Sequence, residues 1–117
     1  MNYTDQQLIN MAHNNPKELS RLLISPNADI KLLTSGAEIL GSEVTDERIV
    51  APVLLQLLKH VHASVREGAV IGASSFYLEK MPPQDILDRL RAIASSDPSP
   101  PVKDSAKILV KDIEKLK

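Results

Sequence analysis

The chain has 117 residues, a length that fits one domain, and its 43% hydrophobic and 25% charged residues are usual for a soluble protein. Fourteen basic against fifteen acidic residues give a net charge of −1, which supplies no overall field to attract nucleic acid or an anionic membrane. The absence of cysteine excludes disulfides, thiolate nucleophiles and cysteine-ligated zinc. No apolar segment is long enough to cross a bilayer, so we expect a cytoplasmic protein that needs no membrane and no cofactor.

Helix start and stop signals divide the first part of the chain into two short helices. Thr4 and Gln7 have the spacing of a capping box, which predicts that the first helix begins after Thr4. Asn15 can cap the second helix, and Pro16 suits its first position. Pro26 ends this second helix.

The next two helices are predicted from the same kind of signals. Asp29 is placed to cap a helix that we expect to stop near Gly41. Thr45 is the expected cap of the following helix, which contains Pro52. A proline inside a helix removes a backbone donor, so Pro52 is expected to bend the axis.

Three further helices complete the pattern. The fifth follows His62 and is expected to continue to about Lys80, before Pro82 and Pro83 break it. The sixth is marked by aliphatic residues at helical spacing, and the seventh begins at Ser99. No alternating run indicates a strand, so the predicted class is all-α.

A similar pattern of residues occurs three times along the chain. Each copy places a leucine or valine followed by small residues shortly after a polar turn, and the three anchors are Leu32, Val65 and Val102. The anchors are separated by 33 and 37 residues (102 − 65 = 37, 65 − 32 = 33). Repeat lengths of this size are typical of stacked helical repeats.

The middle copy resembles a HEAT repeat, a two-helix module of α-solenoid proteins. In that family a proline bends the first helix, an aspartate lies at the turn, and an arginine follows early in the second helix. Pro52 and Arg66 match the proline and the arginine, whereas His60 stands at the aspartate position.

The other two copies match the HEAT pattern less completely. In the third copy Asp97 matches the turn aspartate, Lys103 replaces the arginine, and Arg89 replaces the proline. In the first copy Asn27 replaces the aspartate and Leu33 the arginine. Small residues match the family's alanine positions, where the resemblance implies close approach of neighbouring second helices: Gly36, Ala37, Ala69 and Ala106.

The resemblance implies a short right-handed α-α superhelix of about three helical hairpins preceded by a half-repeat. We expect one domain over residues 1–117, a monomer whose two ends carry polar caps. Its expected parts are a capping helix (1–15) and three repeats (16–42, 43–81 and 82–117).

The sequence contains no group of residues with the spacing of a known type of catalytic site. His60 and His62 could meet at a turn, but no carboxylate lies near them in the sequence, so two solvated turn histidines are the preferred interpretation over a metal site. His13 stands alone. No nucleophile motif and no phosphate-binding glycine loop is present, and the four glycines all fall in or at the ends of helices. We therefore expect a protein that is not an enzyme.

The last helix carries lysines at every fourth position, including Lys103, Lys107 and Lys111. This lysine ridge could bind phosphates, nucleic acid or an acidic partner. Acidic residues flank it, and a solvated face is the preferred interpretation.

These observations favour a non-catalytic protein-interaction module, a scaffold, adaptor or small inhibitor-like regulator. Its partner would be another protein, bound on the face lined by the second helix of each repeat. Candidate contact residues there are Arg66, Glu67 and Tyr77, because tyrosine and arginine are frequent in interface hot spots. Nucleic-acid or phosphate binding through the lysine ridge is the alternative, and an accessory subunit of an enzyme is a second alternative.

Overall fold

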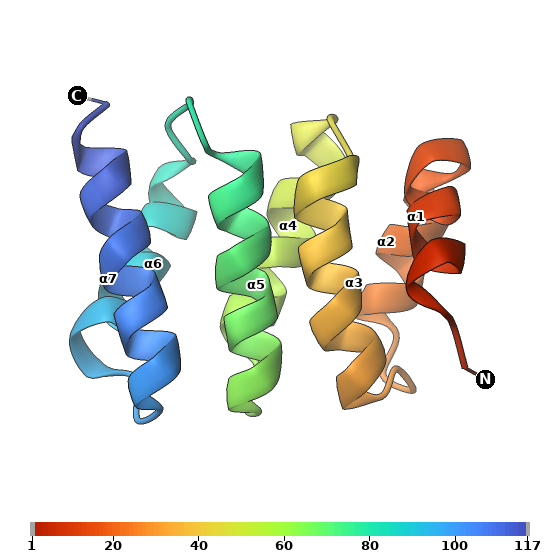
Figure 1. The fold of residues 1–117 in the computed structure, drawn as a ribbon, viewed down its shortest axis with the longest axis horizontal. Coiled ribbons are helices and arrows are strands. Elements are labelled where there is room, and N and C mark those ends of the chain that lie inside the picture. Colours follow the sequence, from red (N-terminus) through yellow and green to blue (C-terminus); the bar gives the residue numbers. More distant parts are fainter. Residues whose placement is uncertain (1, 117) are drawn as a thin grey trace.

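The computed structural model describes residues 2–116, which form seven α-helices and, within that range, no strand. The all-α class expected from the sequence is therefore confirmed. The molecule measures 37 × 27 × 20 Å, and its helices stack side by side along the longest axis (Figure 1). The helices are α1 (Asp5–Asn14), α2 (Pro16–Ile24), α3 (Ile30–Glu43), α4 (Glu47–Leu58), α5 (Ala63–Phe76), α6 (Gln84–Ser96) and α7 (Pro100–Glu114).

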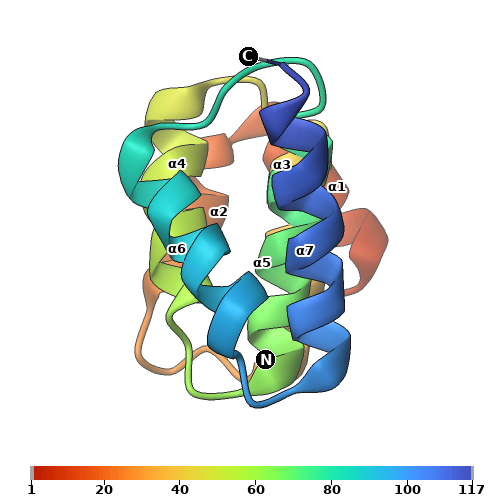
Figure 2. The same cartoon turned by 90° about the vertical axis from the view of Figure 1, so that its left-hand side faces the viewer.

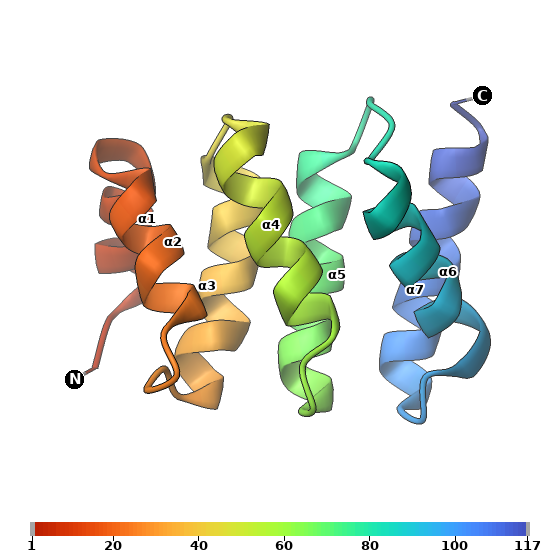
Figure 3. The same cartoon turned by 180° about the vertical axis from the view of Figure 1, so that it is seen from behind.

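The helices lie in two layers. One layer contains α1, α3, α5 and α7, and the other contains α2, α4 and α6 (Figures 2 and 3). The four helices of the first layer all run in the same direction, from the lower to the upper part of Figure 1. Between the layers lies one continuous core, built almost entirely from leucine, isoleucine, valine and alanine. The sequence contains only two tyrosines, one phenylalanine and no tryptophan. The aliphatic side chains that fill the core instead allow the helices to pack closely.

Three of the predicted helix caps form as expected. The Thr4 hydroxyl accepts from the amide of Gln7, whose side chain accepts from the Thr4 amide in return. Asn15 accepts from the amide of Glu18, and Asp29 accepts from the amide of Leu32 at 2.8 Å. These bonds satisfy backbone donors that the first turn of a helix leaves without partners.

The cap predicted for the fourth helix is wrong by one residue. Asp46, not Thr45, precedes α4, and its carboxylate accepts from the amide of Arg48 at 3.0 Å. The same carboxylate also accepts from the Arg48 side chain, so this position offers two interactions where a threonine would offer one. Helix α4 continues through Pro52, and the bend predicted there stays a prediction.

The predicted ends of two helices are also wrong. α3 continues past Gly41 to Glu43, because Gly41 keeps a helical backbone and no glycine adopts a positive φ among the described residues. α5 ends at Phe76, well before Lys80. The next residue, Tyr77, has a non-helical backbone (φ −100°, ψ 33°), is only 1% exposed and meets the Phe76 ring edge-on at 4.9 Å between centroids.

Glycine allows α3 and α5, the two central helices, to approach each other at backbone distance. A Cβ added to Gly68 would lie 2.6 Å from the carbonyl oxygen of Thr34 on α3. A Cβ added to Gly72 would collide with the Ala37 carbonyl oxygen, and one added to Gly41 would collide with the Gly72 backbone. We call Gly41, Gly68 and Gly72 the glycine contact. Gly36, expected at such a contact, instead faces the Leu23 side chain of α2.

The glycine contact predicts that Gly68→Ala destabilises the protein, although alanine is the better helix former. Overpacking against a rigid backbone usually costs about 1–3 kcal/mol, which exceeds the gain of about 1 kcal/mol in helix propensity. The control is Gly36→Ala, because its nearest neighbour is the end of a flexible side chain. Urea unfolding measures both variants. Equal or greater stability of Gly68→Ala relative to wild type would contradict the close backbone contact.

Candidate partner-binding face

The exposed surface of α3, α5 and α7 is the part of the molecule to which the sequence assigned partner binding. It faces the viewer in Figure 1, on the side away from α2, α4 and α6. We call it the front face and define it by Ser35, Glu38, Glu67, Ile71, Ser105 and Ile108. On α5, the residues Val65, Ala69 and Gly72 are buried, and Glu67 and Ile71 project about half a turn away from them.

The Glu67 carboxylate joins α5 to α7 on the front face. One oxygen, Oε1, accepts a hydrogen bond of 2.7 Å from the Ser105 hydroxyl. The other oxygen, Oε2, is buried and has no hydrogen-bond partner among the described residues. A carboxylate oxygen withdrawn from water without a donor is costly, so Glu67 has unused capacity to accept a hydrogen bond.

Glu67 belongs to a row of three carboxylates that crosses the first layer. Partial burial of Glu38 on α3 raises the pKa of its carboxyl above the ordinary value, and the negative charges of Asp5 on α1 and Glu67 raise that pKa further. The charges of Asp5 and Glu67 therefore both reach Glu38 on the helix between them. We call Asp5, Glu38 and Glu67 the acidic row.

Two exposed isoleucines lie on the front face, on the neighbouring helices α5 and α7. Ile71 is 39% exposed and Ile108 is 64% exposed. Because α5 and α7 run in the same direction and the Glu67–Ser105 bond sets their register, Ile71 and Ile108 each lie one turn beyond that bond. We call Ile71 and Ile108 the isoleucine pair. Leu78, which is 73% exposed, follows just beyond the end of α5.

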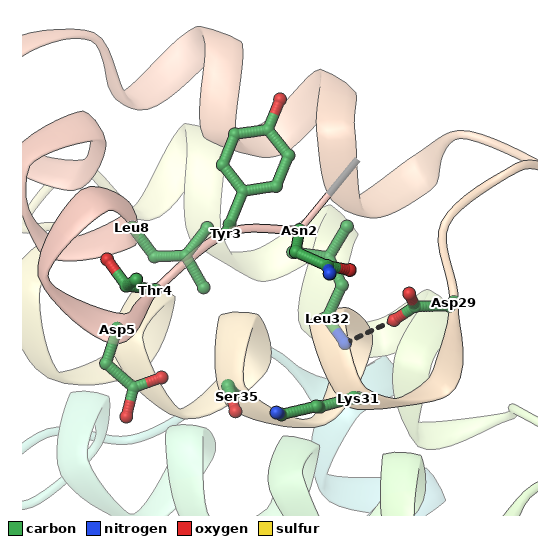
Figure 4. A pocket seen from close by; sticks show the side chains of 9 residues that line it. All are labelled: Asn2, Tyr3, Thr4, Asp5, Leu8, Asp29, Lys31, Leu32 and Ser35. Carbon is green, nitrogen blue, oxygen red and sulfur yellow. Dashed lines mark hydrogen bonds between the residues drawn. The ribbon is translucent and has the colours of Figure 1, made fainter.

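A cleft of about 490 Å³ lies where α1 meets the beginning of α3 (Figure 4). Asp5, Lys31 and Ser35 line it, so the cleft adjoins the acidic row and the front face. The amide of Leu32, which points to this region, is already used by the Asp29 cap. The polar lining of the cleft contains two acids, Asp5 and Asp29, and one base, Lys31, an arrangement suited to polar contacts with a peptide backbone.

Arg66, one of the predicted contact residues, lies inside the protein with 7% of its surface exposed. Its Nε and Nη2 atoms donate to the two carboxylate oxygens of Asp97 at 2.8 and 3.0 Å, and Nη1 donates to the carbonyl oxygens of His60 and Val61. Arg66 therefore joins the turn before α5 to the turn before α7. With four of its five N–H groups bonded inside the protein, Arg66 offers little surface to a partner, and its role as a contact residue stays a prediction.

Tyr77 is also internal. It is 1% exposed, and its hydroxyl donates to Glu47 Oε2 at 2.8 Å. Burial first, and then the hydrogen bond to the Glu47 carboxylate, raise the pKa of the Tyr77 hydroxyl. Tyr77 thus joins the end of α5 to the beginning of α4, and we withdraw it as a contact residue because it has almost no exposed surface.

The lysine ridge lies on α7. Lys107 and Lys111 are exposed, and Lys103 is half-buried. Within residues 2–116, ion pairs on this helix involve Glu114 with Arg91 and Lys115 with Asp112, and none includes Lys103, Lys107 or Lys111. Ser105 faces α5 and Glu114 faces α6, so helical spacing places Lys107 at the end of the helix stack.

The histidines make local contacts. His13 Nε2 lies 2.8 Å from a carboxylate oxygen of Glu43, a pair that links α1 to α3. His60 Nδ1 accepts from the amide of His62, and the His62 side chain makes no cap hydrogen bond. Among the described residues, no group of three or more histidine, aspartate or glutamate side chains is arranged to hold a metal ion.

Comparison of the chain with protein-family models, with curated proteins and with solved structures found no match. None of the helices within residues 2–116 is long and apolar enough to span a membrane.

The Arg66–Asp97 pair predicts a defined loss of stability in acid. Burial alone would raise the pKa of Asp97, but the hydrogen bonds from Arg66 and from the Ser99 amide hold it below its ordinary value. A lowered pKa in the folded state stabilises the protein above the unfolded-state pKa of about 4, and this contribution is lost as the pH falls through the folded-state pKa.

We therefore expect the unfolding free energy of wild type to fall below about pH 4 more steeply than that of Asp97→Asn. At pH 7, Arg66→Ala should cost about 3–5 kcal/mol, because it leaves a buried carboxylate without its cation. Urea unfolding across the acid range measures both effects. Arg48→Ala is the control, since its pair with Asp46 is exposed. Parallel pH curves for wild type and Asp97→Asn would show that the pair contributes nothing.

Proposed function

We propose that this protein is a non-catalytic interaction module that binds another protein on its front face. The isoleucine pair carries the proposal: two large aliphatic side chains are exposed on the same face of the neighbouring helices α5 and α7. Scattered exposed aliphatic residues are ordinary on a monomer, whereas grouped ones on a rigid helical face favour a binding surface. Such a module would act as a scaffold, an adaptor or a small regulator in the cytoplasm, and the isolated chain would be a monomer.

The proposed architecture is a short right-handed HEAT-like solenoid with α1 as the half-repeat. The supporting observations are the two layers of helices and the shared direction of α1, α3, α5 and α7. Arg66, at the family's arginine position, bonds to Asp97, at the aspartate position of the next pair of helices. The resemblance implies this kind of contact between successive repeats, and partners of such solenoids commonly lie across the second helices.

The interaction proposal predicts where a partner will cross-link. A photoreactive amino acid at position 71 or 108 should join the partner, whereas the same amino acid at Ile24 should not, because Ile24 is equally exposed (45%) but lies on α2 in the other layer. Ile71→Asp with Ile108→Asp should weaken partner binding about 10-fold or more, since two buried aliphatic contacts are lost. Ile24→Asp is the matched control. Equal cross-linking from both layers would contradict a front-face site.

Nucleic-acid or phosphate binding through the lysine ridge is a second candidate. The observation that favours it is the exposure of Lys107 and Lys111 without ion-pair partners within residues 2–116. The double variant Lys107→Glu/Lys111→Glu should then abolish binding to a single-stranded oligonucleotide, and wild-type affinity should fall steeply as salt increases. Fluorescence anisotropy measures both. Affinity that is insensitive to salt, or unchanged in the double variant, would remove this candidate.

A further inference from the structure

The front face joins an aliphatic surface to an acidic one. The isoleucine pair lies on α5 and α7, and the acidic row extends from Glu67 on α5 through Glu38 on α3 to Asp5 on α1. Both features share α5, where Glu67 and Ile71 are separated by one helical turn. A ligand lying across these helices would therefore meet both surfaces at once.

The charges of α1, α3 and α5 are unbalanced at this surface. Their basic residues, apart from His13, are Lys31 and Arg66, and Arg66 is buried against Asp97. The His13–Glu43 contact involves the remaining acid of these helices. Lys31 lies with Asp5 at the cleft, and Lys80 lies over the Phe76 ring at 4.1 Å, just beyond the end of α5. Glu38 and Glu67 form no ion pair within residues 2–116.

The acidic row costs folding free energy. Glu38 is partly withdrawn from water beside two other acids, and its carboxyl has a raised pKa for these reasons. A group with a raised folded-state pKa contributes its stability below the unfolded-state pKa, and that contribution is lost as the pH rises through the folded value. At neutral pH the ionised row is therefore unfavourable in the isolated chain, and a cation placed over it would relieve the repulsion.

We propose that the front face binds a cationic amphipathic segment of another protein, whose aliphatic side chains contact the isoleucine pair while its lysine or arginine side chains contact the acidic row. An amphipathic helix that lies across these helices suits this surface, because it carries apolar and basic side chains along neighbouring edges, and Ile71 lies one turn of α5 from Glu67. The Glu67 carboxylate, which Ser105 holds in place on the front face, contributes negative charge to the acidic row. This inference rests on the proposed interaction function and specifies the chemistry of its partner.

The test uses fluorescent helical peptides that share one leucine face and differ only on the polar face, which carries lysine, glutamine or glutamate. Fluorescence anisotropy with the full chain should show binding in the order lysine, then glutamine, then glutamate. Raising salt from about 50 mM to about 300 mM should weaken the lysine peptide most, because exposed charges are screened. Equal affinities for the three peptides, or no binding of the lysine peptide, would overturn the inference.

The variant Glu38→Gln/Glu67→Gln should bind the lysine peptide about 10-fold more weakly, while its affinity for the glutamine peptide is unchanged. The change keeps the acceptor for Ser105, and urea unfolding at pH 7 should show stability equal to or above wild type, so lost binding cannot reflect unfolding. The control is Glu79→Gln, an exposed acid outside the helices. Equal weakening by Glu79→Gln would overturn a specific role of the acidic row.

Two further outcomes separate the inference from the proposed function. If cross-linking places a partner on the front face but the peptides show no charge preference, the interaction function stands and the cationic segment is wrong. If sedimentation shows a dimer that Lys107→Glu/Lys111→Glu and Glu38→Gln/Glu67→Gln each disrupt, a second copy of this chain supplies the cations. That result would overturn the inference in favour of self-association.

Discussion

The backbone contact between α3 and α5 is the constraint on which the rest of the structure depends. Gly68 and Gly72 on α5 and Gly41 on α3 leave no room for a Cβ, so the two central helices meet backbone to backbone. These two helices are the centre of one layer, which continues to α1 beside α3 and to α7 beside α5 (Figure 1). Because the contact fixes how far apart and at what level α3 and α5 lie, it also fixes the relative positions of Glu38 and Glu67.

Polar contacts then attach the outer helices to this central pair. Arg66 satisfies two carbonyl groups of its own turn and both oxygens of Asp97, so one side chain positions the beginning of α7 against α5. Tyr77 makes a comparable link at the other end of α5, where its hydroxyl reaches Glu47 at the beginning of α4. Buried polar groups are favourable only when each of them has a hydrogen-bond partner, and both residues therefore serve the assembly of the helices.

The front face combines features that do not improve stability. Two isoleucines remain exposed on neighbouring helices, two carboxylates act on that of Glu38, and one carboxylate oxygen is buried without a donor. Each of these is unfavourable in the isolated chain, and the proposed segment would cover the isoleucines and offset the charge of the carboxylates. Proteins commonly retain such local costs where they bind other molecules. This coincidence of three costs on one face is the physical basis of the proposed recognition.

The sequence by itself determined the helical class and several of the helix beginnings, because capping depends on residues three positions apart and needs no tertiary contact. It was less accurate at the ends of α3 and α5 and at the cap of α4. Helix α3 continues through Gly41, which packs against α5; α5 ends before the buried Tyr77; and the Asp46 carboxylate caps α4 in place of Thr45. For the candidate site, Glu67 could be selected from the sequence, whereas Arg66 and Tyr77 were selected for their residue types and turned out to be internal. Only the tertiary structure aligned Glu67 with Ser105 and Glu38, and placed Ile71 and Ile108 on the same face, because these residues lie 29–38 positions apart and meet through the register between parallel helices.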